Sequence, residues 1–138
     1  MQDLSIKYRK GYKYQLAEDY HFQTRIRPEA DIFTHFINLN TKGEGRVRHD
    51  YAWDGPSGPT VDTSDAMRGS LGHDAKSQLI RLCLLPYSNK KIADHEIEED
   101  CMKDGMWKWR AKIWHWTLEK FGRASVMPSG ARPILTAP

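Results

Sequence analysis

A turn rich in glycine and proline, "DGPSGP" at residues 54–59, divides this sequence into two halves of different character. The residues before it include "YKYQLAEDYHFQTRI", "DIFTHFINLN" and "NTKGEGRVRHDYAW", in which aromatic and β-branched residues partly alternate as in β-strands. Beyond the turn, the pattern indicates a helix from residue 64 to about Leu85 and a second from about Ile92 to Phe121. Strands followed by helices predict an α+β domain in which a small N-terminal antiparallel sheet or meander is covered by C-terminal helices.

The two helical stretches are separated by "PYSNKK", and the second is interrupted near Asp104-Gly105. A chain of 138 residues is most simply one domain. We assign residues 1–126 to this α+β domain. Residues 127–138 form a tail rich in small residues and proline, which we expect to lack regular structure and to gain order from contacts with the body or a partner.

Composition narrows the possible classes of protein. No apolar stretch reaches the roughly 18 residues of a membrane span, and the N-terminus resembles no signal peptide, so we expect a protein of the cytosol with no membrane insertion. The two cysteines, Cys83 and Cys101, are then expected to be buried reduced thiols. Basic residues interleave with aromatic ones, as in proteins that bind nucleic acid, but a net charge of +3 is well below that class's usual charge.

The segment "GMWKWRAKIWHWTLEKFG" at 105–122 is unusually rich in tryptophan. Helical spacing predicts one buried stripe, made up of Met106, Arg110, Ile113, Trp114, Thr117, Leu118 and Phe121. Trp107, Trp109 and Trp116 fall outside this stripe. We expect these three rings to pack inside the molecule, and the alternative is that they form a surface that binds a partner.

Three residues near the turn are candidates for a catalytic site. Asp54 ends a strand and is followed directly by the rigid turn. Gly69 marks either a break in the helix or a point of close packing, and a break is our preferred interpretation. With a break there, His73 and Asp74 lie in the first turn of a new helix, and we expect Asp54, His73 and Asp74 to meet at one corner of the domain.

The same corner is also a candidate site for a divalent metal. Asp94 on the next helix is the further ligand that would complete a site with Asp54, His73 and Asp74, and Glu98 or His95 could also contribute. Such a site would support metal-assisted hydrolysis of a phosphoester or cell-wall bond. A buried hydrogen-bond network uses the same residue types, and we favour that structural interpretation narrowly.

The motifs "YAWDGPSGPTVDT", "MRGSLGHDA" and "QLIR", followed by "ADHEIEEDCMKDGM" and "RAKIW", resemble phage and prophage proteins of domain-of-unknown-function family 1353. The resemblance extends from about Tyr14 to Gly122. The positions that match its motif are Asp54, Ser57, Pro59, His73, Asp74 and Asp94. The chain departs from the family pattern at Lys76-Ser77, where Leu-Tyr is expected. The resemblance implies phage origin and a compact domain, but no known reaction.

Three functions remain open. The first is a phage accessory protein, associated with the virion or tail, that docks onto other phage proteins and is found in the host cytoplasm or the particle. The second is the metal-assisted hydrolase, and the third is a nucleic-acid-binding protein. Docking is the function that we favour from the sequence.

Overall fold

A computed structural model describes residues 6–8, 14–53, 55, 64–126 and 135–137 of the chain. Its strands are β1 (Ile6–Tyr8), β2 (Tyr14–Gln15), β3 (Tyr20–Gln23), β4 (Ile32–Phe33), β5 (Ile37–Leu39), β6 (Glu44–Val47), β7 (Ala52–Trp53) and β8 (Leu135–Ala137). Its helices are α1 (Ser64–Arg81), the short 3-10 helix η1 (Tyr87–Asn89), α2 (Lys90–Lys103), α3 (Lys108–Phe121) and α4 (Arg123–Val126). This confirms the predicted α+β class and the interruption near Gly105.

The main sheet has four antiparallel strands in the order β3-β6-β5-β4. Alternate residues of β5 and β6 point into the core, so that Ile37 lies opposite Val47 and Leu39 opposite Gly45. The segment "DIFTHFINLN" forms two of these strands. Thr34 makes the turn between them, because its hydroxyl accepts a hydrogen bond from the amide of Ile37 at 2.9 Å.

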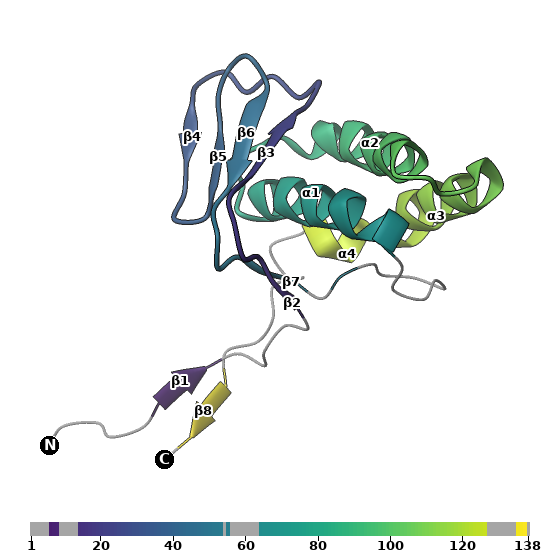
Figure 1. Cartoon of the computed structure of the whole chain (residues 1–138). Helices are drawn as coiled ribbons and strands as arrows, with labels where there is room; N and C mark the ends of the chain where they lie inside the picture. Colours follow the sequence, from purple (N-terminus) through teal and green to yellow (C-terminus); the bar gives the residue numbers. More distant parts are fainter. Residues whose placement is uncertain (1–5, 9–13, 54, 56–63, 127–134, 138) are drawn as a thin grey trace, which may run out of the picture.

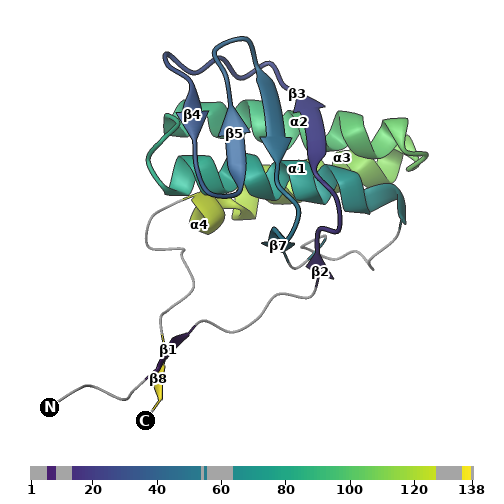
Figure 2. The same ribbon diagram turned by 60° about the vertical axis from the view of Figure 1, so that its left-hand side comes forward.

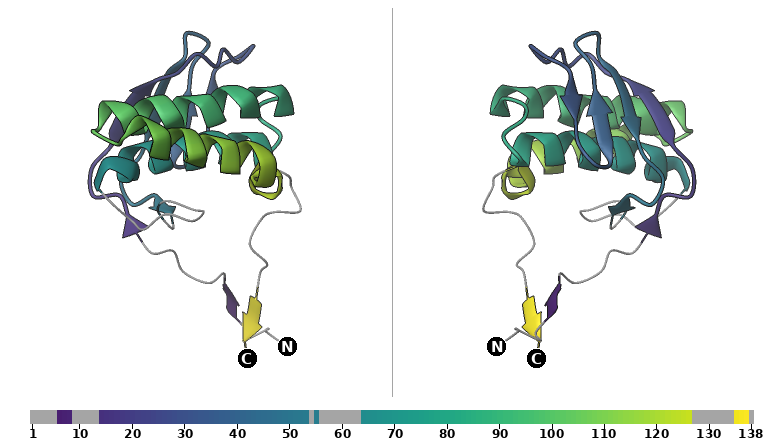
Figure 3. Two further views of the ribbon diagram at one scale, coloured as in Figure 1. Left: turned by 90° about the vertical axis from the view of Figure 1, so that its right-hand side faces the viewer. Right: turned by 90° about the vertical axis from the view of Figure 1, so that its left-hand side faces the viewer.

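The helices lie on one side of this sheet (Figures 1 and 2). Helix α1 faces the sheet with Leu71, Ala75 and Leu79, which recur every four residues and join the core cluster of the strands. Helix α3 lies on the side of α1 and α2 that is away from the sheet, as the left view of Figure 3 shows. A second core cluster, which includes Ile97 of α2 and Trp114 of α3, joins these helices. Within the described residues, no helix combines the length and apolarity needed to cross a membrane.

Helix α1 is continuous through Gly69 and Gly72, so the predicted break at Gly69-Ser70 was wrong. The alternative interpretation of Gly69, that it marks a point of close packing, is confirmed. A Cβ atom at this position would lie 2.8 Å from the sulfur of Cys101 and 3.3 Å from Cγ1 of Ile97. A side chain at residue 69 would therefore collide with α2, and glycine allows the two helices to pack closely there.

The cysteines are both free thiols, as expected, but only one of them is buried. Burial raises the pKa of the Cys101 thiol to about 12, and the neighbouring carboxylate of Asp100 adds to this effect. Cys101 therefore stays protonated in the core. Cys83 is exposed, which corrects the prediction that it is buried, because the chain has already left α1 at Arg81.

The C-terminal tail is not irregular throughout. Residues 135–137 form β8, which pairs antiparallel with β1, and this corrects the prediction for these three residues. The two strands lie apart from the main sheet and the helices in Figures 1 to 3. The remainder of the tail, residues 127–134 and 138, lies outside the described residues.

The two glycines of α1 allow the helix contact to be tested by one substitution at two positions. We expect Gly69→Ala to destabilise the protein by about 1–3 kcal/mol, because overpacking against Cys101 outweighs the gain in helix propensity. Gly72→Ala should instead stabilise it by about 0.4–1 kcal/mol, since the nearest atom to the added Cβ is the Lys76 ammonium at 3.8 Å. Urea unfolding measures both, and equal effects of the two variants would contradict the close contact.

Candidate functional site

The structure brings His73 and Asp94 together, as two members of the predicted corner. Nε2 of His73 on α1 lies 2.7 Å from Oδ1 of Asp94 on α2. The ammonium of Lys90 binds the other carboxylate oxygen of Asp94 and also donates a hydrogen bond to the backbone carbonyl of Leu118 at 3.0 Å. Because Leu118 belongs to α3, this network joins three helices.

The charges in this network are almost completely removed from water. The side chains of Asp94 and Lys90 are 1% and 8% exposed. Burial alone would raise the pKa of Asp94, but hydrogen bonds from His73 and Lys90 hold the pKa of this carboxyl below its usual value. Asp94 is therefore a carboxylate whose charge is already balanced by Lys90.

Asp74 has different partners from its neighbour His73. Its carboxylate accepts a hydrogen bond from the hydroxyl of Tyr51, which follows β6 in the chain, and that hydroxyl also lies 3.0 Å from Oε1 of Gln78. Burial raises the pKa of Asp74, and the hydrogen bond from Tyr51 only partly offsets this effect. Consecutive residues on a helix point about 100° apart, which accounts for the divergence.

Asp54 lies outside the described residues, so its place in the corner stays a prediction. Lys76, where the resemblance led us to expect leucine, is among the described residues. Lys76 is 3% exposed, and its ammonium lies 3.3 Å from Oε1 of Glu96 and 5.4 Å from the ring centre of Phe22. A buried cation paired with a carboxylate therefore stands at this position.

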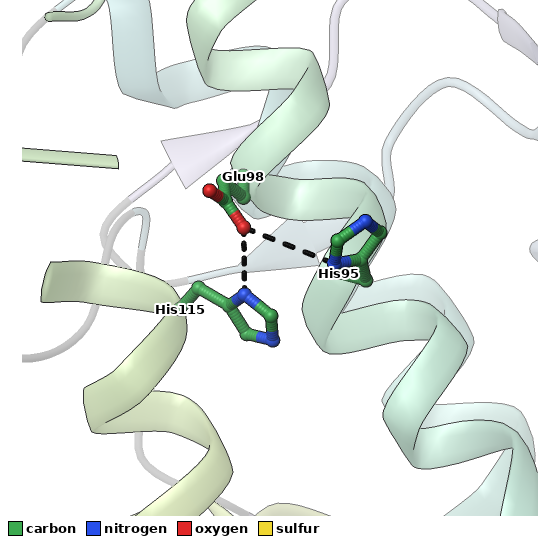
Figure 4. Close-up of side chains that lie close together, drawn as sticks. All are labelled: His95, Glu98 and His115. Carbon is green, nitrogen blue, oxygen red and sulfur yellow. Dashed lines mark hydrogen bonds and ion pairs between the residues drawn. The ribbon is translucent and has the colours of Figure 1, made fainter. Parts of the chain in front are cut away.

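A different group of residues brings metal-binding atoms together. Among the residues that the structure describes, only His95, Glu98 and His115 place three ligand atoms within 4.8 Å of one another (Figure 4). The sequence had suggested His95 and Glu98 as additional ligands beside Asp94. It gave no sign of His115, because this residue meets Glu98 only through the packing of α3 against α2.

The third feature is the outer face of α3. Trp107, Trp109 and Trp116 are 72%, 59% and 55% exposed, so the expectation that their rings pack inside the molecule was wrong. Ile113, which was predicted to be buried, is 49% exposed. Met106, Trp114 and Leu118 of the predicted stripe are buried, and Ala111 is buried beside them. The stripe was therefore predicted in part, and the alternative of a partner surface remains for the three exposed tryptophans.

Comparisons of the chain with protein-family models, with curated proteins and with solved structures gave no match.

The two aspartates of the corner should show opposite responses to pH. The depressed pKa of Asp94 contributes stability that is present above its unfolded pKa of about 3.9 and is lost as the pH falls through the folded pKa. The raised pKa of Asp74 contributes stability only at low pH, and this is lost as the pH rises through the folded pKa.

We therefore expect Asp94→Asn to destabilise the protein at neutral pH by about 2–4 kcal/mol, because it leaves Lys90 without its buried counter-charge. Asp74→Asn should cost less at neutral pH, since an amide oxygen still accepts from Tyr51 without a buried charge. Urea unfolding between about pH 3 and pH 7 measures both variants. The pairing is refuted if Asp94→Asn leaves the acid-induced loss of stability unchanged.

Proposed function

We propose that this chain is a phage accessory protein that docks onto another virion protein through the outer face of α3. This face consists of Trp107, Trp109, Ile113 and Trp116. The observation that carries the proposal is the exposure of these four large apolar side chains, each of which is 49% exposed or more. An exposed apolar cluster of this kind is typical of protein interaction surfaces.

The spacing of these residues makes the surface continuous. Trp109, Ile113 and Trp116 stand at positions i, i+4 and i+7 of one helix and share one side of it. Trp107 directly precedes the helix, and its ring centre lies 6.3 Å from that of Trp109. Tryptophan is also the residue type most enriched among the side chains that dominate binding energy in protein interfaces.

The charges around this face favour an acidic partner. The exposed charged residues of α3 are Lys108, Lys112, Lys120 and Glu119, so that three positive charges and one negative charge give a net +2. A second copy of the chain would place like charges opposite each other, which is unfavourable. We infer a partner surface with an apolar patch surrounded by carboxylates.

The phage context rests on the resemblance of the motifs to family 1353. It supports a role as a virion- or tail-associated protein, made in the host cytoplasm and incorporated into the particle. The metal-assisted hydrolase at Asp54, His73, Asp74 and Asp94 has less support, since Lys90 already balances the charge of Asp94. Nucleic-acid binding has less support as well, because the net charge is only +3.

The double variant Trp109→Ala/Trp116→Ala should weaken docking by at least about tenfold, because each indole is expected to act as a binding hot spot. The measurement is co-sedimentation of the purified chain with particles assembled from a phage genome from which the gene for this chain has been deleted. Both rings are more than half exposed, so thermal unfolding of the variant should remain close to that of the wild type.

Phe33→Ala is the matched control, because it removes another exposed aromatic ring, which is 76% exposed and lies on β4 of the sheet. This variant should co-sediment as the wild type does. Equal binding by all three proteins would refute the surface. A dimer in analytical ultracentrifugation that the double variant abolishes would refute the virion partner, as would salt-sensitive binding of a single-stranded oligonucleotide through the same rings.

A further inference from the structure

We propose that His95, Glu98 and His115 form a binding site for a zinc ion between α2 and α3. The site is separate from the docking surface, and its evidence does not depend on the proposed function. Two imidazoles and one carboxylate are a ligand set that proteins use for zinc, and in such sites a further position is left open for water or another ligand.

The ligand atoms already lie near the spacing that a zinc ion needs. Oε2 of Glu98 is 2.7 Å from Nδ1 of His115 and 3.8 Å from Nδ1 of His95. Ligand atoms of a tetrahedral zinc site are about 3.3 Å apart, given bonds of roughly 2.0–2.1 Å to the metal. These two distances lie on either side of this value, and all three ligand atoms lie within 4.8 Å of one another, so side-chain rotations can bring them to one metal ion.

A carboxylate lies near the second nitrogen of each imidazole. Nε2 of His95 lies 3.3 Å from Oε1 of Glu99, and Nε2 of His115 lies 3.9 Å from Oε2 of Glu119. The Glu99 carboxylate favours the tautomer of His95 that carries its proton on Nε2, which leaves the Nδ1 lone pair of His95 for a metal. Nδ1 of His115 donates a hydrogen bond to Oε2 of Glu98, and binding of zinc to this nitrogen would release that proton.

Glu98 provides the negative charge of the site. The side chain is 6% exposed, and its carboxylate accepts a hydrogen bond from Nδ1 of His115 at 2.7 Å. Lys112 contacts Oε1 at 3.3 Å, which leaves Oε2 to face the two imidazoles.

The open side of the site faces a cavity of about 330 Å³. Its wall includes both His95 and His115, together with Arg25, Lys91, Ile92 and Glu119. A water molecule can therefore complete the coordination from this side.

The choice of metal follows from the ligand atoms. Imidazole nitrogens suit zinc and other late first-row metals, whereas magnesium and calcium prefer sites made of oxygen atoms alone. Two of the three ligand atoms here are nitrogen, which favours zinc over magnesium.

The test is titration of the purified full chain with Zn²⁺ in competition with a chromophoric chelator. We expect one Zn²⁺ per chain for the wild type, and a loss of more than about 100-fold in affinity for His95→Ala, because even outer partners of metal ligands contribute 10–100-fold. Glu99→Gln should weaken binding by about tenfold, since it only orients His95. Cobalt added in place of zinc should show the strong visible absorption of a tetrahedral site in the wild type but not in His95→Ala.

His49→Ala is the matched control. Nδ1 of His49 lies 2.9 Å from Oδ1 of Asp19, which makes it another histidine paired with a carboxylate, and it does not belong to the three-residue group. This variant should bind zinc as the wild type does. His95 is 52% exposed, so His95→Ala should fold normally, and circular dichroism checks this. Zinc binding that persists in His95→Ala, for example at the exposed Cys83 thiol, would overturn the proposal, as would absence of binding by the wild type.

Discussion

The arrangement of the helices depends on one buried ion pair, between Lys90 and Asp94. Each buried ion costs several kcal/mol in lost hydration unless its hydrogen-bonding capacity is filled, so such a pair is tolerated only in a well-defined setting. Here three helices supply the hydrogen bonds. His73 of α1 hydrogen-bonds to Asp94, and the ammonium of Lys90 donates to the carbonyl of Leu118 on α3. Any shift of α1 or α3 against α2 would leave a buried charge without a partner. The network therefore selects one packing of the helices, in addition to the apolar contacts that drive it.

The close contact between α1 and α2 and the position of α3 both follow from this packing. Gly69 lets α1 and α2 pack closely at Cys101. The contact between His73 and Asp94 belongs to the same interface between these two helices. On its other side α2 carries Glu98, and α3 is placed so that His115 lies directly against it. The candidate zinc ligands thus come together through the same helix packing, although none of them belongs to the ion-pair network itself.

The parts of this structure that could be predicted from sequence are those that depend on local pattern. Alternation and turn residues indicated the strands, and Gly105 indicated the end of α2, where its φ of 101° suits glycine. The prediction for Gly69 failed because a glycine in a helical sequence can indicate either a break in the helix or a close contact with a neighbouring element. The sulfur atom of Cys101, which shows that the close contact is the correct interpretation, belongs to the next helix. His115 was missed for the same reason, whereas the i, i+3 spacing of His95 and Glu98 is visible in the sequence.

Helix α3 could be oriented only in part from its sequence because both of its faces carry apolar side chains. The buried face contains one indole, in Trp114, together with Ala111 and Leu118, while the outer face contains the indoles of Trp109 and Trp116 and the side chain of Ile113. The outer face therefore carries more large apolar side chains than the buried one. In the observed orientation the carbonyl of Leu118 accepts a hydrogen bond from Lys90, and His115 faces Glu98. The large apolar side chains of the outer face of α3 therefore remain in water. A partner that covers this face would remove them from water, and this is the strongest argument for docking.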